Sequence, residues 1–238
     1  MAKISKLNDN ANKGGIQFEF FKELEQYFVD SDDTVIDKLA NFPKYVTRQS
    51  LTNFLAKYEI YKKIKNVNGS IVECGVLFGG GLLSFAHFSS IFEPINYTRK
   101  IIGFDTFEGF PSLSKQDKSK NPNNQMKKGG YKVNSLNDLK KCIELYDSNR
   151  FINQIPKIEL VKGNVNKTIP KYLKDNPHLI VSLLYLDLDL YEPTKIALQN
   201  FLPRMPKGSI IAFDEINVDQ WPGETLALLD EVGIRNLR

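Results

Sequence analysis

The chain has 238 residues, of which 42% are hydrophobic and 25% charged, and its formal net charge is +4. This composition is typical of a globular protein and excludes a disordered chain, a collagen or a coiled-coil rod. The charge is too small to indicate a nucleic-acid partner. No apolar run approaches the roughly 18–20 residues that a membrane span needs, so we expect no membrane-spanning segment.

The cysteines and the N-terminus indicate the compartment. Two cysteines cannot build a disulfide scaffold or a four-cysteine zinc site. The first fifteen residues lack the apolar core of a secretory signal. We therefore expect a cytoplasmic protein.

Aromatic residues at helical spacing predict two helices in the first part of the chain, over residues 16–29 and 47–65. The second would carry its apolar face on Leu51, Phe54, Leu55, Tyr58 and Tyr61. We expect residues 1–66 to form an N-terminal helical extension. Its aromatic side chains could form the contact of a homo-oligomer, or could pack against the sheet of their own chain.

From residue 67 onward, short apolar strands alternate with helices. Strands are expected over residues 70–75, 100–104, 157–161, 179–186 and 208–213, with helices between them and after the last. This alternation predicts an α/β fold with a doubly wound, mostly parallel, Rossmann-like sheet, so residues 67–238 should form a single structural unit. Ser135 followed by Asp138 predicts a capped start for one of the helices.

A glycine-rich turn follows the first expected strand. Glu73 lies two residues before Gly75, and Gly79, Gly80 and Gly81 come next. Ligands of open α/β sheets bind at the carboxyl ends of strands, and glycines let them approach the backbone. The turn lacks the motifs of dinucleotide and phosphate loops, and an acid there suits a cationic amine better than a pyrophosphate. The alternative is an ordinary strand–helix turn with a capping acid.

Asp105 ends the second expected strand. A carboxylate at this position can accept hydrogen bonds from both hydroxyls of a ribose, as in dinucleotide-binding folds. Phe107 and Phe110 follow it, and they could wall an adenine or belong to the core. Asp105 by itself indicates little, because acids often end strands, but together with the glycine-rich turn it favours a nucleoside site.

Four acids follow the last two expected strands: Asp187 and Asp189 after one, Asp214 and Glu215 after the other. Such acids would repel one another unless a cation lies among them. Ligand sets made only of oxygen favour magnesium or calcium over zinc. The alternative is a mixture of helix caps and solvated acids.

Residues 112–134 hold six lysines and one aspartate, a net charge of +5 in a segment that is otherwise rich in Pro, Asn and Gly. A long loop at the ligand end of the sheet often acts as a lid. Its charge would attract an anionic substrate such as a nucleotide-diphosphate sugar. A solvated loop without such a role is the alternative.

In order and spacing these motifs resemble the macrocin O-methyltransferase family. The resemblance covers roughly residues 45–232 and is carried by residues 73–76 with Gly79 and Gly80, 105–111, Gly163 with 168–170, 187–194 and 220–225. The last stretch is similar to a branch of the family associated with bacterial sugar and polysaccharide clusters. This chain departs from the family pattern at two positions. The family commonly has a serine where Thr106 stands and a second aspartate where Glu215 stands. It also usually has two further strands, so the C-terminal strands here should be short or missing.

The resemblance implies a methyltransferase sheet and S-adenosylmethionine as methyl donor. It assigns eight residues to the donor pocket: Glu73, Gly75, Gly79, Gly80, Asp105, Thr106, Gly163 and Asn164. By position, Glu73 and Gly75 would face the methionine part of the donor, Asp105 the ribose, and Gly163 and Asn164 the adenine.

The resemblance also implies magnesium, held by Asp187, Asp214 and Glu215, and a sugar hydroxyl as acceptor, on a nucleotide sugar, a polysaccharide or a natural-product glycoside. A sugar hydroxyl is a poor nucleophile, so a bound magnesium would lower its pKa and a carboxylate would take its proton. Asp187 is the candidate base as well as a metal ligand. Asp189 is the alternative base, or it anchors the following helix.

Other functions fit the same residues. A magnesium-dependent methyltransferase of a catechol-like phenol would share the acid site and differ only in its acceptor pocket. A non-catalytic nucleotide-binding protein would need no base. A nicotinamide-dependent oxidoreductase is disfavoured, because the Gly-x-Gly-x-x-Gly motif is missing.

Overall fold

The computed structural model describes residues 15–237 and divides into two compact units, Met1–Ala56 and Lys57–Arg238. The boundary expected after residue 66 falls just past the end of helix α3 and stays a prediction. The stretch that we interpreted as lacking a secretory signal lies outside the described residues, apart from its last residue.

The first unit contains short helices joined by turns. They are α1 (Gly15–Asp30), α2 (Val35–Ala40), the 3-10 helix η2 (Phe42–Lys44) and the beginning of α3 (Arg48–Ile64). The ring of Tyr45 stacks on Tyr27 and meets Phe28 edge-on, with ring centroids 5.6 and 5.2 Å away. Both helices expected in this part of the chain are therefore present.

The second unit is built on a five-stranded parallel sheet with the order β3-β2-β1-β4-β5. The strands are β1 (Ser70–Cys74), β2 (Ile101–Asp105), β3 (Ile158–Lys162), β4 (Val181–Leu186) and β5 (Ile210–Phe213). The chain builds outward from β1 to β3 and then returns to pair β4 with the other side of β1. This reversal confirms the doubly wound sheet and opens a crevice at the carboxyl ends of β1 and β4.

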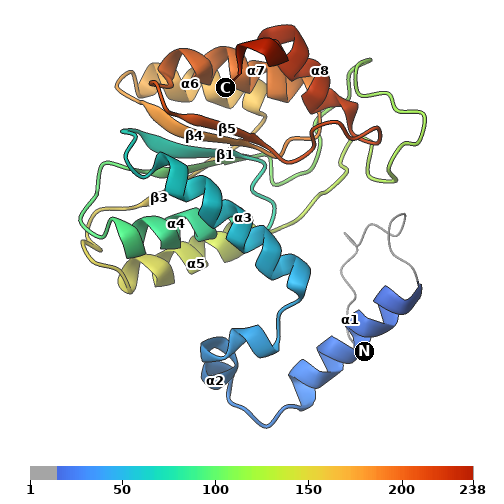
Figure 1. Cartoon of the computed structure of the whole chain (residues 1–238), viewed down its shortest axis with the longest axis vertical. Coiled ribbons are helices and arrows are strands. Elements are labelled where there is room, and N and C mark those ends of the chain that lie inside the picture. Colours follow the sequence, from blue (N-terminus) through green and yellow to red (C-terminus); the bar gives the residue numbers. More distant parts are fainter. Residues whose placement is uncertain (1–14, 238) are drawn as a thin grey trace. The chain divides into compact units, whose positions relative to one another are not determined.

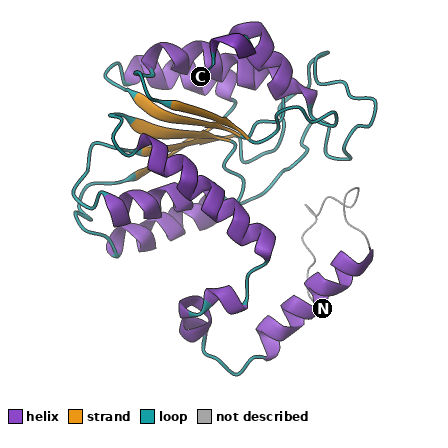
Figure 2. Ribbon diagram, viewed as in Figure 1, coloured by secondary structure: helices purple, strands orange, loops and turns teal. Residues whose placement is uncertain are grey.

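Helices cover both faces of the sheet (Figures 1 and 2). One face carries α4 (Gly80–Phe92), α5 (Leu136–Ser148) and the part of α3 that belongs to this unit. The other carries α6 (Val165–Asp175), α7 (Tyr191–Phe201) and α8 (Pro222–Glu231). The 3-10 helices η3 (Leu202–Arg204) and η4 (Ile234–Asn236) follow α7 and α8.

Side chains of each strand alternate between the two helical layers, as strand geometry requires. In β4, Leu184 and Leu186 pack in the core below α6, α7 and α8, whereas Leu183 and Tyr185 pack in the core next to α3 and α4. A strand buried on both faces reads as a continuous apolar run, which is why β4 is easy to recognise in the sequence. The same alternation turns Glu73 of β1 toward the α3–α4 face.

Two local predictions were wrong. On α3, Tyr61 of the expected apolar face is buried, but Phe54 and Leu55 are exposed, and Lys57 and Ile64 are buried with Tyr61 instead. Ser135 precedes α5 but makes no side-chain cap; its hydroxyl donates instead to the carbonyl of Leu77 in the glycine-rich turn. At Ser135 this tertiary contact overrides the local pattern.

Within the described residues β5 is the last strand, and it lies at the edge of the sheet. None of the described helices combines the length and the apolar character needed to cross a membrane.

Candidate functional site

A cavity of about 280 Å³ lies at the carboxyl ends of the strands, close to the lower end of the roughly 300–1,000 Å³ of small-molecule sites. All five strand ends contribute to its lining, with Gly75, Asp105, Thr106, Asn164, Asp187, Asp189, Asp214 and Glu215. The residues that follow the predicted strands therefore meet around one cavity.

Four of the eight residues assigned to the donor pocket do not line this cavity. Glu73 is buried on the α3–α4 face of the sheet, with 3% of its surface exposed. Gly79 precedes α4 and Gly80 begins it. The N–H of Gly163 donates to the carbonyl of Asp105 at 2.8 Å. Contact between these four residues and a donor stays a prediction.

The glycine at position 75 is required by the protein itself. Its φ of +92° lies in the region that side chains rarely adopt, and a Cβ there would come within 1.8 Å of the carbonyl oxygen of Asp187. At Gly81 a Cβ would come within 1.9 Å of Oε1 of Glu73. These glycines thus allow close approach between β1, α4 and the acid loop after β4.

Asp105 uses most of its carboxylate to hold the loops around the cavity. Its Oδ2 accepts hydrogen bonds from the N–H groups of Val76 and Leu77, at 2.7 and 2.9 Å, and its Oδ1 accepts one from Phe107 at 2.6 Å. Since a carboxylate offers about four acceptor positions in all, one remains on Oδ1 for a ligand hydroxyl.

Thr106 and Asn164 also shape loops. The Thr106 hydroxyl donates to the carbonyl of Gly109 at 2.8 Å and accepts from the N–H of Glu108 at 3.0 Å. Oδ1 of Asn164 accepts from the N–H of Asn166 at 3.0 Å and so caps α6. Both residues line the cavity with side chains whose positions are fixed by these bonds.

The acids after β4 and β5 share one electrostatic environment. Burial, the Asp214 carboxylate and then Glu224 raise the pKa of Asp187 well above its usual range. Burial and the charge of Asp187 do the same to Asp189. Because these carboxylates oppose each other's ionisation, each would be stabilised in its charged form by a nearby cation.

Within residues 15–237, no three His, Cys, Asp or Glu side chains already converge as a metal site. Asp214 lines the cavity while its Oδ1 accepts a hydrogen bond from the hydroxyl of Tyr185 at 3.0 Å. The assignment of Asp187, Asp214 and Glu215 to a metal therefore stays a prediction.

Glu224 is a site residue that our interpretation of the sequence missed. Its side chain is fully buried, and its Oε1 accepts hydrogen bonds from the N–H groups of Leu188 and Asp189, at 2.7 and 3.1 Å. Its Oε2 accepts one from the N–H of Glu215 at 3.3 Å. Burial raises the pKa of Glu224 to about 7. One side chain of α8 thus fixes both acid loops, and only its place in the 220–225 motif could have indicated it.

The lysine-rich segment is closed at its base. Phe110 and Gly130 are linked there by the bond from the Phe110 N–H to the Gly130 carbonyl, at 3.0 Å. Asp117 is 2% exposed, and its Oδ1 accepts a hydrogen bond from the N–H of Tyr191, the first residue of α7, at 2.7 Å. The segment is thus pinned at two places, while its six lysines are exposed.

Phe107 and Phe110, which could wall an adenine or belong to the core, separate clearly, and Tyr191 and Trp221 are two further aromatic residues near the site. Phe110 lines the cavity, whereas Phe107, Tyr191 and Trp221 are 7%, 4% and 3% exposed and pack in the protein. Tyr191 also donates its hydroxyl to Asp230 at 2.9 Å.

Comparisons with known proteins agree with this architecture. The sequence model of the macrocin O-methyltransferase (TylF) family matches residues 44–226. The crystal structure of the calicheamicin methyltransferase CalS11 is similar, with 32% identity, a TM-score of 0.90, and 99% of this chain and 93% of that one covered. The apo structure of CalS11, described as a TDP-rhamnose 3'-O-methyltransferase, has 33% identity and a TM-score of 0.81 over 94% and 88% of the chains.

The O-methyltransferase NovP shares the fold, with 20% identity and a TM-score of 0.58 over 74% of this chain and 69% of that one. No curated protein matches the chain.

Proposed function

Because the chain belongs to the macrocin O-methyltransferase family and is an O-methyltransferase, we propose that it transfers a methyl group from S-adenosylmethionine to a sugar hydroxyl with the help of magnesium. One observation carries this proposal. The same cavity is lined by donor-side residues, Gly75 and Asp105, and by the acids Asp187 and Asp214. A bound nucleoside donor and an acceptor hydroxyl would therefore lie within one enclosed space.

The donor side fits a nucleoside. Asp105 has one acceptor position left on Oδ1 after holding the loops around it, which suits a ribose hydroxyl. Gly75 keeps the backbone open beside it, and Phe110 adds an aromatic surface to the cavity. These features support S-adenosylmethionine as the donor.

The acid side fits a hard divalent cation. Its candidate ligands Asp187, Asp214 and Glu215 offer only oxygen, and burial together with mutual repulsion raises the pKa of Asp187. Glu224 holds the two loops that carry them. Bound magnesium would lower the pKa of the acceptor hydroxyl there.

The chain's own contribution is to orient the reactants and to take up one proton. Oxygen-to-methyl bond formation and breakage of the methyl–sulfur bond occur together, while a carboxylate oxygen of Asp187 takes the hydroxyl proton. Asp189 is the alternative acceptor of that proton. Most of the acceleration would come from holding donor and acceptor in line inside the cavity.

An anionic, nucleotide-linked sugar is the acceptor class that we favour. The loop of residues 112–134 that carries the six exposed lysines has a net charge of +5, and its residues Gly130 and Tyr131 line the cavity. A relative of 33% identity is described as acting on TDP-rhamnose. Positive charge at the cavity mouth would attract the diphosphate of such a substrate.

Calorimetry with S-adenosylhomocysteine tests the donor site. Asp105→Ala should weaken binding by about 10–100-fold, because it removes a charged acceptor of hydrogen bonds. Asp138→Ala removes an exposed acid of α5 and should leave binding unchanged. Equal affinities of the Asp105 variant and the wild type would refute the donor assignment. Methyl transfer to diphenols but not to sugars would favour the catechol-type alternative.

Salt dependence tests the acceptor class. For a nucleoside-diphosphate sugar, kcat/KM should fall as the salt concentration rises, and Lys128→Ala with Lys132→Ala should reduce both kcat/KM and its salt dependence. The matched control is Lys171→Ala with Lys174→Ala on α6, which removes the same charge from exposed lysines that do not flank the cavity lining. A salt-independent rate in the wild type would remove the anionic acceptor from consideration.

A further inference from the structure

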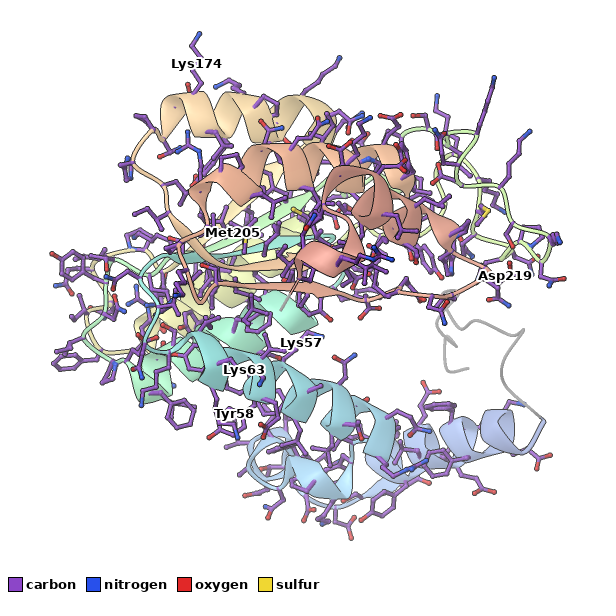
Figure 3. All side chains as sticks on the ribbon, turned by 45° about the horizontal axis from the view of Figure 1, so that its top comes forward. Lys57, Tyr58, Lys63, Lys174, Met205 and Asp219 are labelled. Carbon is purple, nitrogen blue, oxygen red and sulfur yellow. The ribbon has the colours of Figure 1, made fainter. Side chains whose placement is uncertain are left out.

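The buried lysine of α3 is the strongest feature that the proposed function leaves unexplained. Lys57 is 8% exposed, although lysine is rarely buried without a partner. Figure 3 labels it together with Lys63 of the same helix, which is exposed. Lys57 lies four residues before Tyr61 and seven before Ile64, so helical spacing places it on the buried face of α3. The reason that a lysine occupies this position must lie in what surrounds it.

Strand register explains what Lys57 meets. Tyr185 of β4 pairs with Glu73 of β1 on one side and with Ala212 of β5 on the other. Side chains alternate along a strand, so positions two residues apart share a face. Asp187 lies two residues after Tyr185, and Asp214 lies two residues after Ala212. Tyr185, Asp187 and Asp214 therefore share the α3–α4 face.

Lys57 lies directly on this group. Its Nζ donates to the hydroxyl of Tyr185 at 3.3 Å and stands 4.8 Å from the centre of the Tyr185 ring. The Tyr185 hydroxyl is in turn 3.0 Å from Oδ1 of Asp214. The positive charge of Lys57 also acts on Glu73 and Asp187, where it opposes the rise in their pKa values.

The chemistry of these groups fixes the direction of the chain of hydrogen bonds. A lysine ammonium has only donors, so the Tyr185 oxygen must accept from it. The single hydroxyl hydrogen of Tyr185 is then directed to Asp214. Oδ1 of Asp214 thereby keeps one of its two acceptor positions open, whereas no hydrogen bond among the described residues occupies Oδ2, so Oδ2 is the less engaged oxygen for the cavity that Asp214 lines.

We propose that Lys57 and Tyr185 are positioning residues, which fix the orientation of Asp214 so that its Oδ2 is directed to the magnesium of the proposed function. This inference rests on that function. Partners in the outer shell of a metal site orient its ligands, and losing one typically weakens metal binding by about 10–100-fold.

The direct test is calorimetric titration of the intact protein with Mg²⁺. Tyr185→Phe keeps the ring, which packs 5.8 Å from Phe85, and removes only the hydroxyl. We expect it to weaken Mg²⁺ binding about 10–100-fold and to leave the affinity for S-adenosylhomocysteine unchanged. Tyr172→Phe is the matched control, because it removes a comparable hydroxyl–carboxylate bond, to Glu159 at 2.8 Å, outside the site.

Lys57 variants separate positioning from plain charge. Coulomb repulsion between the Lys57 ammonium and the cation predicts by itself that removing this positive charge strengthens Mg²⁺ binding. The positioning role predicts the opposite: Lys57→Met should weaken binding by about threefold or more, the scale of one hydrogen bond. Lys57→Arg keeps the charge and the donors and should restore most of the affinity.

Each result decides the matter. Non-additive losses in the double variant of Lys57→Met and Tyr185→Phe would support action through one relay. Wild-type affinity in Tyr185→Phe, or tighter binding in Lys57→Met, would overturn the positioning role while the metal site stands. If the wild type itself binds no Mg²⁺, the metal of the proposed function is refuted and the relay falls with it.

Discussion

Two buried charge clusters lie at opposite ends of the same sheet, and they are built in opposite ways. At the amino end, Arg99 is 3% exposed and pairs with Glu93, its Nε standing 2.8 Å from Oε2. Arg99 also donates to the backbone carbonyls of Gly69, Lys65 and Val67 and to the Ser182 hydroxyl. The charges of Arg99 and Glu93 thus each have partners that match them.

At the carboxyl end the acids outnumber the partners available to them. Oε2 of Glu73 is buried without a hydrogen-bond partner among the described residues. Burial raises the pKa of Glu73, and so do Asp187 and Asp105, while Lys57 opposes them. An orphaned buried acceptor costs roughly 1–3 kcal/mol, so this end is held in an unfavourable electrostatic state.

The pKa of each cluster's glutamate expresses the difference. Burial by itself would raise the pKa of Glu93, but hydrogen bonds from Tyr61, Arg99 and Asn96 bring it below its usual value. Glu73 is buried more deeply and has no such set of donors, so its pKa is raised. The paired charges at the amino end therefore stabilise the fold, whereas the acids at the carboxyl end lower its stability where a ligand would be bound.

The largest expected effect is at the carboxyl end. Asp187→Asn should lower kcat by about 10²–10⁴-fold, because the base of the proposed reaction is lost. It should not lower the melting temperature, because it also removes one of several repelling carboxylates. Initial rates and differential scanning calorimetry measure the two quantities.

An exposed acid of the loop after β5 supplies the control for that variant. Asp219, labelled in Figure 3, does not line the cavity, and Asp219→Asn should change the rate by no more than about twofold. A melting temperature that drops with Asp187→Asn would contradict the idea that the acids oppose stability.

At the amino end, Arg99→Met should lower stability and leave the rate unchanged, the opposite of Asp187→Asn. It leaves Glu93 buried without its charged partner, which typically costs about 3–5 kcal/mol of unfolding free energy. The rate per folded molecule should stay unchanged, since Arg99 does not line the cavity. Urea unfolding gives the stability, and adding Glu93→Gln should recover part of it. A loss of rate without a loss of stability would break the distinction between the two ends.

Lys157 adds a pH dependence to the amino end. It is 4% exposed, its Nζ donates to the Asn96 carbonyl at 2.6 Å, and burial lowers its pKa to about 8. Glu93 opposes this shift, and the charges of Arg150, Arg99 and Lys100 reinforce it.

Between pH 8 and its ordinary value of 10.5, Lys157 thus binds fewer protons in the folded state than in the unfolded state. The wild type should therefore gain up to about 3 kcal/mol over this window relative to Lys157→Met. Unfolding curves at pH 7, 9 and 10.5 measure the difference, and a constant difference across the window would show that the Lys157 pKa is not depressed.

Much of this architecture is predictable from the sequence, for a physical reason. β4 lies inside the sheet, between β1 and β5, and is buried on both faces, so its apolar run from Leu179 to Leu186 is unmistakable. Parallel strands place their carboxyl ends at one edge, so Asp105, Asp187 and Asp214 could be expected to meet. All three line the cavity.

What escaped prediction depends on contacts between distant segments. Helical spacing places Lys57 on the face of α3 that also buries Tyr61 and Ile64, but the local pattern does not explain a lysine there, because the acids that it faces come from other strands. Glu224 and Asp117 hold backbone N–H groups of remote loops, and such bonds leave no periodic signal in the sequence. The helix cap expected at Ser135 failed for the same reason.

The smallest prediction asks whether the carboxyl end is unfavourable throughout or only at its acids. Ser135 is 4% exposed and donates its hydroxyl to the Leu77 carbonyl, a neutral bond between α5 and the glycine-rich turn. If only the acids are strained, this bond should contribute normally, and Ser135→Ala should lower the unfolding free energy by about 1 kcal/mol. Asp138→Asn should change it by less than about 0.5 kcal/mol, because Asp138 is exposed and Ser135 makes no side-chain cap. If the two variants lose equal unfolding free energy, Ser135 and Asp138 do form the expected capping box. If Ser135→Ala loses none, the neutral contacts of the carboxyl end also add little to stability.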